Sequence, residues 1–241
     1  MIRLHVIAEG QTEEEFINSV LGPHLCTFEI YANARCVETS RKRRIYSGRD
    51  LTKINRGGLL QYEKAKNDLL RWMREDQKCD SFFTTMLDLY AIPCDFPGFA
   101  DAAKKTNPYE RVSIIEEAFE ANIQTIRDDP RFIPYIQLHE FEALLLSDPG
   151  KFKFRFSGCE QAIQKLVELS DQFDSPELIN DGNETAPSKR IIELIPEYKG
   201  VKASAGPLIA KYIGLPKILE KCTHFSEWVE KLKALRPINI S

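Results

Sequence analysis

Acidic side chains stand at the ends of apolar runs in this sequence. Glu9, Asp88 and Glu142 each lie at or just beyond the end of such a run. Short apolar runs of partly alternating character predict β-strands. Because open parallel sheets bind ligands at the carboxyl ends of their strands, we expect these three carboxylates to lie together at one edge of a sheet.

Gathered carboxylates repel one another unless a cation neutralises them, and their hard oxygen atoms suit Mg²⁺ or Mn²⁺. A divalent ion held in this way can activate water and bind a phosphate group, which is the core of metal-assisted phosphodiester cleavage. Glu13, four residues after Glu9, could supply another oxygen to this ion or to a second one. The acids therefore predict a divalent metal site.

Each of the three carboxylates also has a purely structural interpretation. Glu9 could be a turn residue, Asp88 could cap the next element, and Glu142 could favour the positive N-terminal end of a helix. Their coincidence at three strand ends favours the metal site over these separate roles.

Two acids next to Glu13 fit helix capping better than metal binding. Thr12 and Glu15 have the spacing of a capping box, in which the two side chains satisfy free N–H groups at the start of a helix. We therefore assign Glu14 and Glu15 to the start of a helix over residues 13–25.

Cysteine and histidine offer no alternative metal site. The six cysteines are scattered, and no pair has the two-residue spacing typical of zinc sites. The four histidines are dispersed as well. His139, at a predicted strand-to-helix junction, is either a general acid or base near the metal or a structural hydrogen-bonding residue.

A strongly basic segment lies between residues 41 and 56. Its net excess of six positive charges indicates either a solvated loop or helix face, or a surface that contacts phosphates. The whole chain has a net charge of −3, so it is not a general polyanion binder. The segment contains one acid, Asp50, and seven cations: Arg41, Lys42, Arg43, Arg44, Arg49, Lys53 and Arg56.

The elements that must position these side chains alternate in type. Strand patterns alternate with helical apolar spacing, which predicts an α/β fold, a mostly parallel sheet flanked by helices. We expect strands over residues 2–8, 29–40, from 81 to Asp88, and over 132–138, and helices over residues 13–25, 59–75 and 110–126, with a further helix opening at His139.

The character of the chain changes after Pro149, because helical patterns follow without a strong strand pattern. We therefore expect residues 1–150 to form the α/β catalytic domain. Residues 151–241 should form a small, mainly helical C-terminal part packed on it. The sequence contains no apolar stretch long enough to span a membrane and no secretory signal at its start, which favours a soluble, cytoplasmic protein.

Several motifs resemble a known family. A strand that ends in Glu-Gly with Thr-Glu just after it ("AEGQTEEEF"), followed much later by a strand that ends in Asp ("TTMLDLY"), is similar to the Toprim catalytic domain. Together with "DLYAIPCDFPG", "PYIQLHEFEALLL" and "NETAPSKRI", these motifs resemble one bacterial Toprim-like family of unknown function, number 4276 in its series, over roughly residues 1–215. This resemblance implies a Toprim-like fold. It also implies a neighbourhood of ABC-type ATPases in defence loci, and a relation to OLD-family (overcoming lysogenization defect) metal-dependent nucleases.

The resemblance assigns roles to individual residues. It implies that Glu9 is the Toprim glutamate and that Asp88 is the first aspartate of the Asp-x-Asp motif. Tyr90 stands where the second aspartate is expected, so Asp95 or Glu142 would have to complete the metal shell. The late basic residue of the related nucleases corresponds to Lys189, whose charge could stabilise the reacting phosphate.

We therefore expect a nuclease that binds Mg²⁺ or Mn²⁺ and hydrolyses DNA or RNA, with an ABC-type ATPase partner in anti-phage defence. Two alternatives remain open. The chain could be a non-catalytic regulatory or binding subunit of an ATPase-containing complex, which the missing second aspartate favours. It could also be a phosphatase or a nucleotidyl enzyme acting on small substrates, which would not need the basic segment.

Overall fold

A parallel sheet forms the centre of the protein. The computed structural model describes residues 1–46, 49–56, 61–179 and 185–238, with the backbone alone over residues 38–46 and 49–56. Five strands pair in parallel in the order β2-β1-β5-β6, and β7 also pairs with β5. The predicted α/β class is confirmed. The strands are β1 (Ile2–Ala8), β2 (Ile30–Cys36), β5 (Ser81–Asp88), β6 (Phe132–Ile133) and β7 (Ile136–Gln137).

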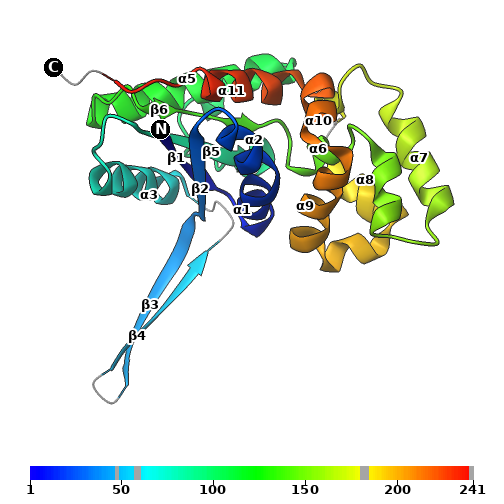
Figure 1. Ribbon diagram of the computed structural model, residues 1–241, viewed down its shortest axis with the longest axis horizontal. Coiled ribbons are helices and arrows are strands. Elements are labelled where there is room, and N and C mark those ends of the chain that lie inside the picture. Colours follow the sequence, from blue (N-terminus) through cyan, green and yellow to red (C-terminus); the bar gives the residue numbers. More distant parts are fainter. Residues whose placement is uncertain (47–48, 57–60, 180–184, 239–241) are drawn as a thin grey trace.

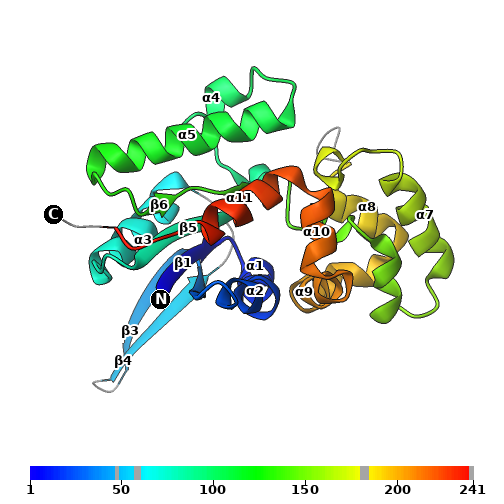
Figure 2. The ribbon, with the colours of Figure 1, turned by 45° about the horizontal axis from the view of Figure 1, so that its top comes forward.

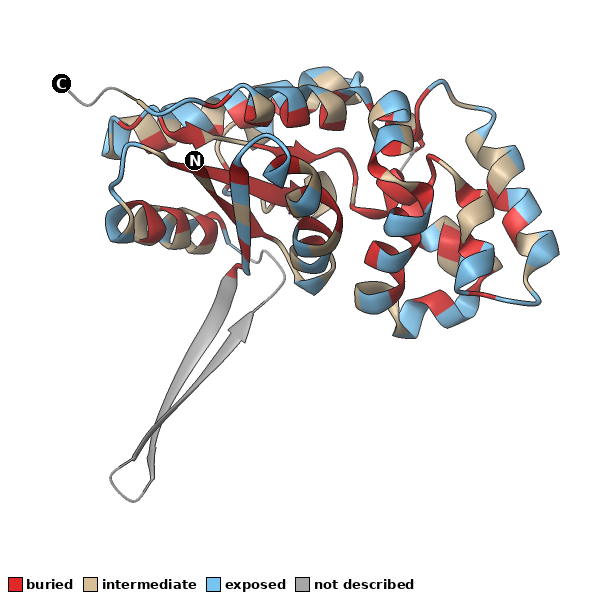
Figure 3. Cartoon of the chain, in the orientation of Figure 1, coloured by how far each residue is buried: buried red, intermediate tan, exposed pale blue. Residues whose placement is uncertain are grey.

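Helices cover both faces of this sheet, as Figures 1 and 2 show. Alternate side chains of a strand point to opposite faces, so Phe82 and Met86 join one core while Phe83 and Leu87 join the other. Figure 3 shows that the central strands are buried between these layers. One face packs against α3 (Tyr62–Glu75) and α5 (Pro108–Ile126), and the other against α1 (Gln11–Phe16), η1 (Ile17–Leu21), α2 (Gly22–Cys26) and α11 (Thr223–Lys233).

The chain after Pro149 is helical and shares an apolar core with the sheet. The last helix returns to the sheet, where the Trp228 indole N–H donates to Thr84 Oγ1 at 3.0 Å and its ring stacks on Tyr135. The main helices of this part are α7 (Glu160–Ser170), α8 (Pro187–Leu194), α9 (Lys202–Ile213) and α10 (Leu215–Lys221). Short helices are η2 (Leu89–Ala91), α4 (Phe99–Ala102), α6 (Glu142–Leu145), η3 (Pro149–Phe154), η4 (Pro176–Leu178) and η5 (Pro196–Gly200).

The first helix begins earlier than predicted. Gly10 is extended, with φ −149° and ψ −170°, and the helix starts at Gln11. Glu13 is therefore the third helical residue, and its Oε2 accepts the Gly10 N–H at 2.8 Å. The predicted capping box of Thr12 and Glu15 is wrong because the helix starts ahead of both residues.

Two predicted strands have different bounds in the structure. The strand expected over residues 29–40 ends at Cys36, and the backbone that follows forms the antiparallel hairpin of β3 (Glu38–Tyr46) and β4 (Arg49–Arg56), labelled in Figure 1. The strand expected over residues 132–138 is divided into β6 and β7, since Pro134 between them lacks an N–H for the ladder.

The side chains of the basic segment lie outside what the structure describes, so their role in nucleic-acid binding stays a prediction. Those seven cations are Arg41, Lys42, Arg43, Arg44, Arg49, Lys53 and Arg56. Among the described residues, no helix is both long and apolar enough to cross a membrane.

A buried glutamate fastens the last helix to the rest of the fold. Glu177 is fully buried, and its carboxylate accepts the N–H groups of His224 and Phe225 at 3.0 and 2.9 Å. Tyr109 donates its hydroxyl to the same carboxylate at 3.2 Å. These two N–H groups belong to the first turn of α11, where no carbonyl within the helix can accept them.

We expect Glu177→Ala to destabilise the protein by about 3 kcal/mol, because it leaves buried donors without an acceptor. Glu177→Gln retains one acceptor oxygen and should lose less than half as much. Urea unfolding of the two variants measures the difference. An alanine variant as stable as the glutamine variant would contradict this role.

Candidate active site

The ends of β1 and β5 bring two of the predicted acids together. Ala8 pairs with Met86 in the parallel ladder, so Glu9 and Asp88 leave neighbouring strands at the same edge. The N–H of Asp88 donates to Glu9 Oε2 at 2.9 Å. Their proximity follows from the register of the two strands.

The first turn of α1 adds a third acid. Glu13 is buried, at 6% exposure, and its hydrogen bond to Gly10 folds the side chain back toward the end of β1. Glu15, two residues later, is exposed. The helix therefore selects Glu13 from the run of glutamates and orients it to the sheet edge.

The segment after β7 supplies two more acids. His139 is buried and has a left-handed backbone, with φ +62°, which is uncommon for a residue other than glycine. Its carbonyl accepts the N–H of Tyr90 at 3.0 Å. If the chain were extended here, Glu140 would point away from the face that Glu142 uses. The chain turns at His139 instead, and the charges of both Glu140 and Glu142 act on Asp88.

We refer to these five carboxylates as the acidic cluster. Burial raises the pKa of Glu9 to about 7, and the charges of Glu140 and Glu142 add to this effect. Burial likewise raises the pKa of Glu13 to about 7, with the charge of Glu9 contributing. For Asp88, burial and the charges of the other four acids raise the pKa well above its usual value. The members are Glu9, Glu13, Asp88, Glu140 and Glu142.

One oxygen of the cluster has no partner. Asp88 Oδ1 is buried and accepts no hydrogen bond from any residue that the structure describes. A buried acceptor of this kind is unfavourable unless water or a ligand satisfies it. Because four like charges surround this atom, the ligand that would stabilise it best is a cation.

A lysine that the sequence did not single out neutralises part of the cluster. Lys202 Nζ lies 3.2 Å from Glu142 Oε1, and the buried Tyr198 hydroxyl donates to the same oxygen at 3.3 Å. Burial and the negative charge of Glu142 raise the pKa of Tyr198 well above its usual value, so it remains a donor. On the other side, Ser188 donates its N–H and its hydroxyl to Glu140, the latter at 3.0 Å.

Close packing fixes α9 beside the cluster. A Cβ atom on Gly206 would lie 2.9 Å from the Phe141 ring and 3.2 Å from the Tyr198 hydroxyl. Only a residue without a side chain allows α9 to approach this closely. The position of Lys202 therefore depends on contacts one turn further along its helix.

Three other predicted residues have different surroundings. Lys189 is exposed on α8, next to Ser188, which bonds Glu140, whereas Lys202 contacts Glu142 directly. Asp95 is exposed, and its Oδ1 accepts the N–H of Tyr62 at 3.3 Å at the start of α3. Tyr90, in the position expected for a second aspartate, places its ring 5.7 Å from that of His139.

The donor set of the cluster fits a hard divalent cation in its chemistry, since it consists of carboxylate oxygens and includes the unpartnered Asp88 Oδ1. Within the described ranges, no three side chains of His, Cys, Asp or Glu already have the geometry of a metal site. One oxygen of each of Glu9, Glu13 and Glu142 accepts a hydrogen bond or an ion pair from the protein. An ion bound at Glu142 Oε1 would displace Lys202 from that oxygen.

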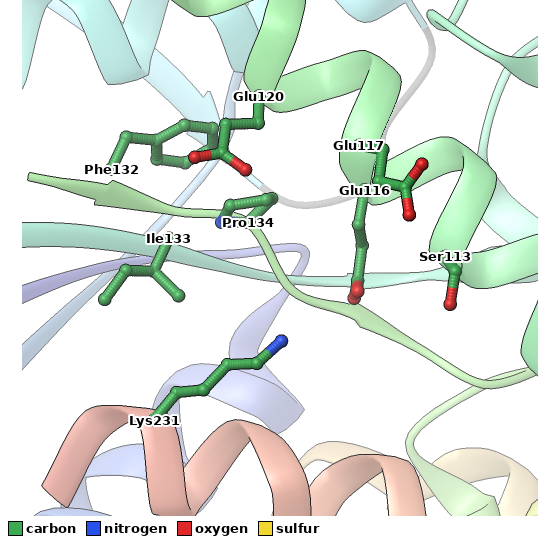
Figure 4. A pocket seen from close by; sticks show the side chains of 8 residues that line it. All are labelled: Ser113, Glu116, Glu117, Glu120, Phe132, Ile133, Pro134 and Lys231. Carbon is green, nitrogen blue, oxygen red and sulfur yellow. The ribbon is translucent and has the colours of Figure 1, made fainter. Parts of the chain in front are cut away.

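A separate pocket of about 330 Å³ lies between α5, β6 and α11 (Figure 4). Its one buried acid, Glu116, bonds His224 at 3.0 Å and accepts the N–H of Ile136 at 2.8 Å. No member of the acidic cluster lines it. The lining residues are Ser113, Glu116, Glu117, Glu120, Phe132, Ile133, Pro134 and Lys231.

Comparison with known proteins identifies one match. The family model described as Domain of unknown function (DUF4276) matches residues 8–233. This range runs from the end of β1 to the end of α11 and contains the whole acidic cluster. No curated protein and no solved structure matches the chain.

Proposed function

The chain belongs to the DUF4276 family, and we propose that it is a nuclease that uses Mg²⁺ or Mn²⁺ to hydrolyse phosphodiester bonds in DNA or RNA. The observation that carries this proposal is the convergence of five carboxylates around the unpartnered Asp88 Oδ1 at the carboxyl edge of a parallel sheet. Ligands of such sheets bind at this edge. A cluster serving only stability would not need so many like charges in a buried place.

Glu9, Asp88 and Glu142 would hold the ion. The N–H of Asp88 orients Glu9, and Ser188 fixes Glu140, so the protein limits the freedom of two of the acids. When bound, the ion would supply Lewis-acid stabilisation of the phosphate and a nucleophile at neutral pH. Lys202, released from Glu142, would offer its ammonium group to the negative charge of the substrate.

Two further features support a nucleic-acid substrate and the Toprim likeness. Glu9 and Asp88 end adjacent parallel strands, as the Toprim resemblance requires. The hairpin that carries the basic segment also begins next to this edge, because Cys36 pairs with Ala8, the N–H of Val37 donates to the Ala8 carbonyl at 2.9 Å, and β3 follows at Glu38. An ABC-type ATPase partner in anti-phage defence belongs to the proposal through the resemblance alone.

The test is cleavage of plasmid DNA, single-stranded DNA and total tRNA by purified protein with Mg²⁺, with Mn²⁺ and with a chelator. The proposal expects cleavage of at least one substrate that either metal supports and the chelator abolishes. Absence of cleavage in every condition, also after addition of the ATPase, would refute it.

A second function has one specific observation in its favour. Tyr90 occupies the place of the second Toprim aspartate and lies against His139, and Asp95 faces the start of α3. A regulatory subunit that binds a metal without cleaving would tolerate this departure. Calorimetry that detects Mn²⁺ binding, combined with no cleavage in the presence of the ATPase, would favour this alternative.

We expect Lys202→Met to lower the rate of cleavage about 10²-fold, because it removes a cation from the developing charge on the phosphate. Lys189→Met is the comparison variant and should stay within about twofold, since Lys189 is exposed and it is Lys202 that contacts Glu142. Initial rates with a saturating metal concentration measure both. If Lys189→Met lost cleavage activity and Lys202→Met did not, Lys202 would not be the cation that stabilises the phosphate.

A further inference from the structure

The sequence "KFKFRF" at residues 151–156 alternates cations with phenylalanines. Phe152 and Phe156 are buried in the core beside Tyr198. Phe154 instead stays 50% exposed, although it stands between two core residues. The core therefore accounts for two of the three aromatic rings and leaves the role of the third unexplained.

Phe154 stacks on another exposed ring. Its centroid lies 4.4 Å from that of Tyr212 on α9, with 19° between the planes, and Tyr212 is 46% exposed. The two rings cover one face of each other, so their exposed area lies on the outer faces and edges. Leu208, one helical turn before Tyr212, is also exposed and extends this apolar surface along α9.

Positively charged residues flank this stacking pair of Phe154 and Tyr212 in the sequence. Lys153 Nζ lies 5.4 Å from the centre of the Phe154 ring, and Arg155 and Lys211 are exposed next to the pair in sequence. No acidic residue stands between Lys151 and Cys159 in the sequence. The surface thus combines open aromatic faces with cations, which is the composition of single-strand binding sites.

We infer that the stacking pair binds unpaired bases of single-stranded DNA or RNA, while the flanking cations contact the phosphates. This inference rests on the proposed function and names the form of its substrate. Every base has a π-face that can stack on an aromatic ring, but the faces are covered by neighbouring bases in a duplex. The stacking pair therefore selects single strands over duplexes.

The stacking pair and the acidic cluster are joined by one rigid element. Lys202 stands at the start of α9 and Tyr212 near its end, ten residues later, which corresponds to about 15 Å along a helix axis. A single strand of DNA or RNA that lies along the exposed side of α9 would extend from the stacking pair toward the acidic cluster. The chain thereby positions a single strand relative to the acids.

Binding is best measured with Glu9→Gln as the background, because cleavage then does not remove the probe. The probes are fluorescent oligo-dT and oligo-U of about 12 nucleotides, and a duplex of the same length. Phe154→Leu and Tyr212→Leu, which keep apolar bulk but remove the ring, should each weaken single-strand binding about tenfold. The ratio of oligo-dT to oligo-U affinity separates the DNA and RNA sources of the same chemistry.

Phe28→Leu is the matched control. Phe28 is 43% exposed and also has a lysine over its ring, Lys233 at 4.9 Å, but it lies by the amino end of β2. The Phe28→Leu variant should bind single strands with the same affinity as the Glu9→Gln protein. Charge removal in Lys153→Gln and Lys211→Gln should each reduce the salt slope of single-strand binding by about 0.7.

Two results would overturn the inference. Unchanged binding by the leucine variants, with a lower melting temperature, would make the pair an internal clamp between η3 and α9. If the leucine variants lost as much affinity for the duplex as for single strands, the stacking pair would not select single strands. The proposed function fails separately: a wild-type protein that binds single strands through this pair but never cleaves them retains the inference and loses the nuclease.

Discussion

Replacing Glu9 with glutamine is expected to reduce metal-dependent cleavage by at least about 10³-fold while the protein stays folded. Glutamine has the size of glutamate and can still accept the N–H of Asp88, so the local structure should persist. It lacks the charge that binds a divalent ion, whose contribution to phosphate chemistry is several kcal/mol, and about 1.4 kcal/mol corresponds to tenfold in rate. Initial rates under saturating Mn²⁺ provide the measurement.

Glu15→Gln serves as the control for this variant, because Glu15 is exposed on the same helix and lies outside the acidic cluster. It should cleave at the wild-type rate. If Glu9→Gln retained more than about a tenth of the wild-type rate with a normal melting temperature, Glu9 would not be a metal ligand.

The parts of the fold that follow local patterns could be predicted from the sequence. The apolar runs that end at Glu9 and Asp88 predicted two strands, and parallel pairing then placed the two acids at one edge. The basic segment was harder, because its charges obscured the alternation of a hairpin, and only the Ser47-Gly48 pair between the two strands is a turn signal in the sequence.

The parts of the site that depend on tertiary packing could not be predicted. Lys202 has no local signal, since its place is set by how closely α9 approaches Phe141 through Gly206. Glu140 would face away from the other acids in an extended chain, and the left-handed turn at His139 that precedes it is invisible in the sequence pattern. Sequence motifs therefore predict where strands end, but they do not predict which side chains from other elements lie next to those strand ends.

The acidic cluster also predicts how stability depends on pH and on metal. In the folded protein, the pKa values of Glu9 and Glu13 are raised from 4.5 to about 7. The folded state thus holds protons that the unfolded state has released between these values. The resulting stabilisation is complete below about pH 4.5 and is lost as the pH rises through 7.

We therefore expect this cluster to make the metal-free protein less stable at pH 8 than at pH 5.5, and Mn²⁺ to reverse the loss. A cation at 100 times its Kd adds about 2.7 kcal/mol to the folded state, which raises the melting temperature by roughly 5–10 °C for a chain of this size. The rise should be smaller at pH 5.5, because protons compete with the ion for the carboxylates. Thermal unfolding with and without Mn²⁺ at the two pH values measures this difference.

Asp88→Asn separates the metal effect from general ionic effects. The change removes a buried carboxyl that the charges of four other acids repel, so the metal-free variant should be more stable than wild type at pH 8, on the order of 1 kcal/mol. The same variant should lose the rise that Mn²⁺ produces, and with it cleavage. Stability and function would then move in opposite directions at one residue, which is the behaviour of a site whose repulsion is relieved by a ligand. A variant that is less stable than wild type and still responds to Mn²⁺ would show instead that Asp88 is structural.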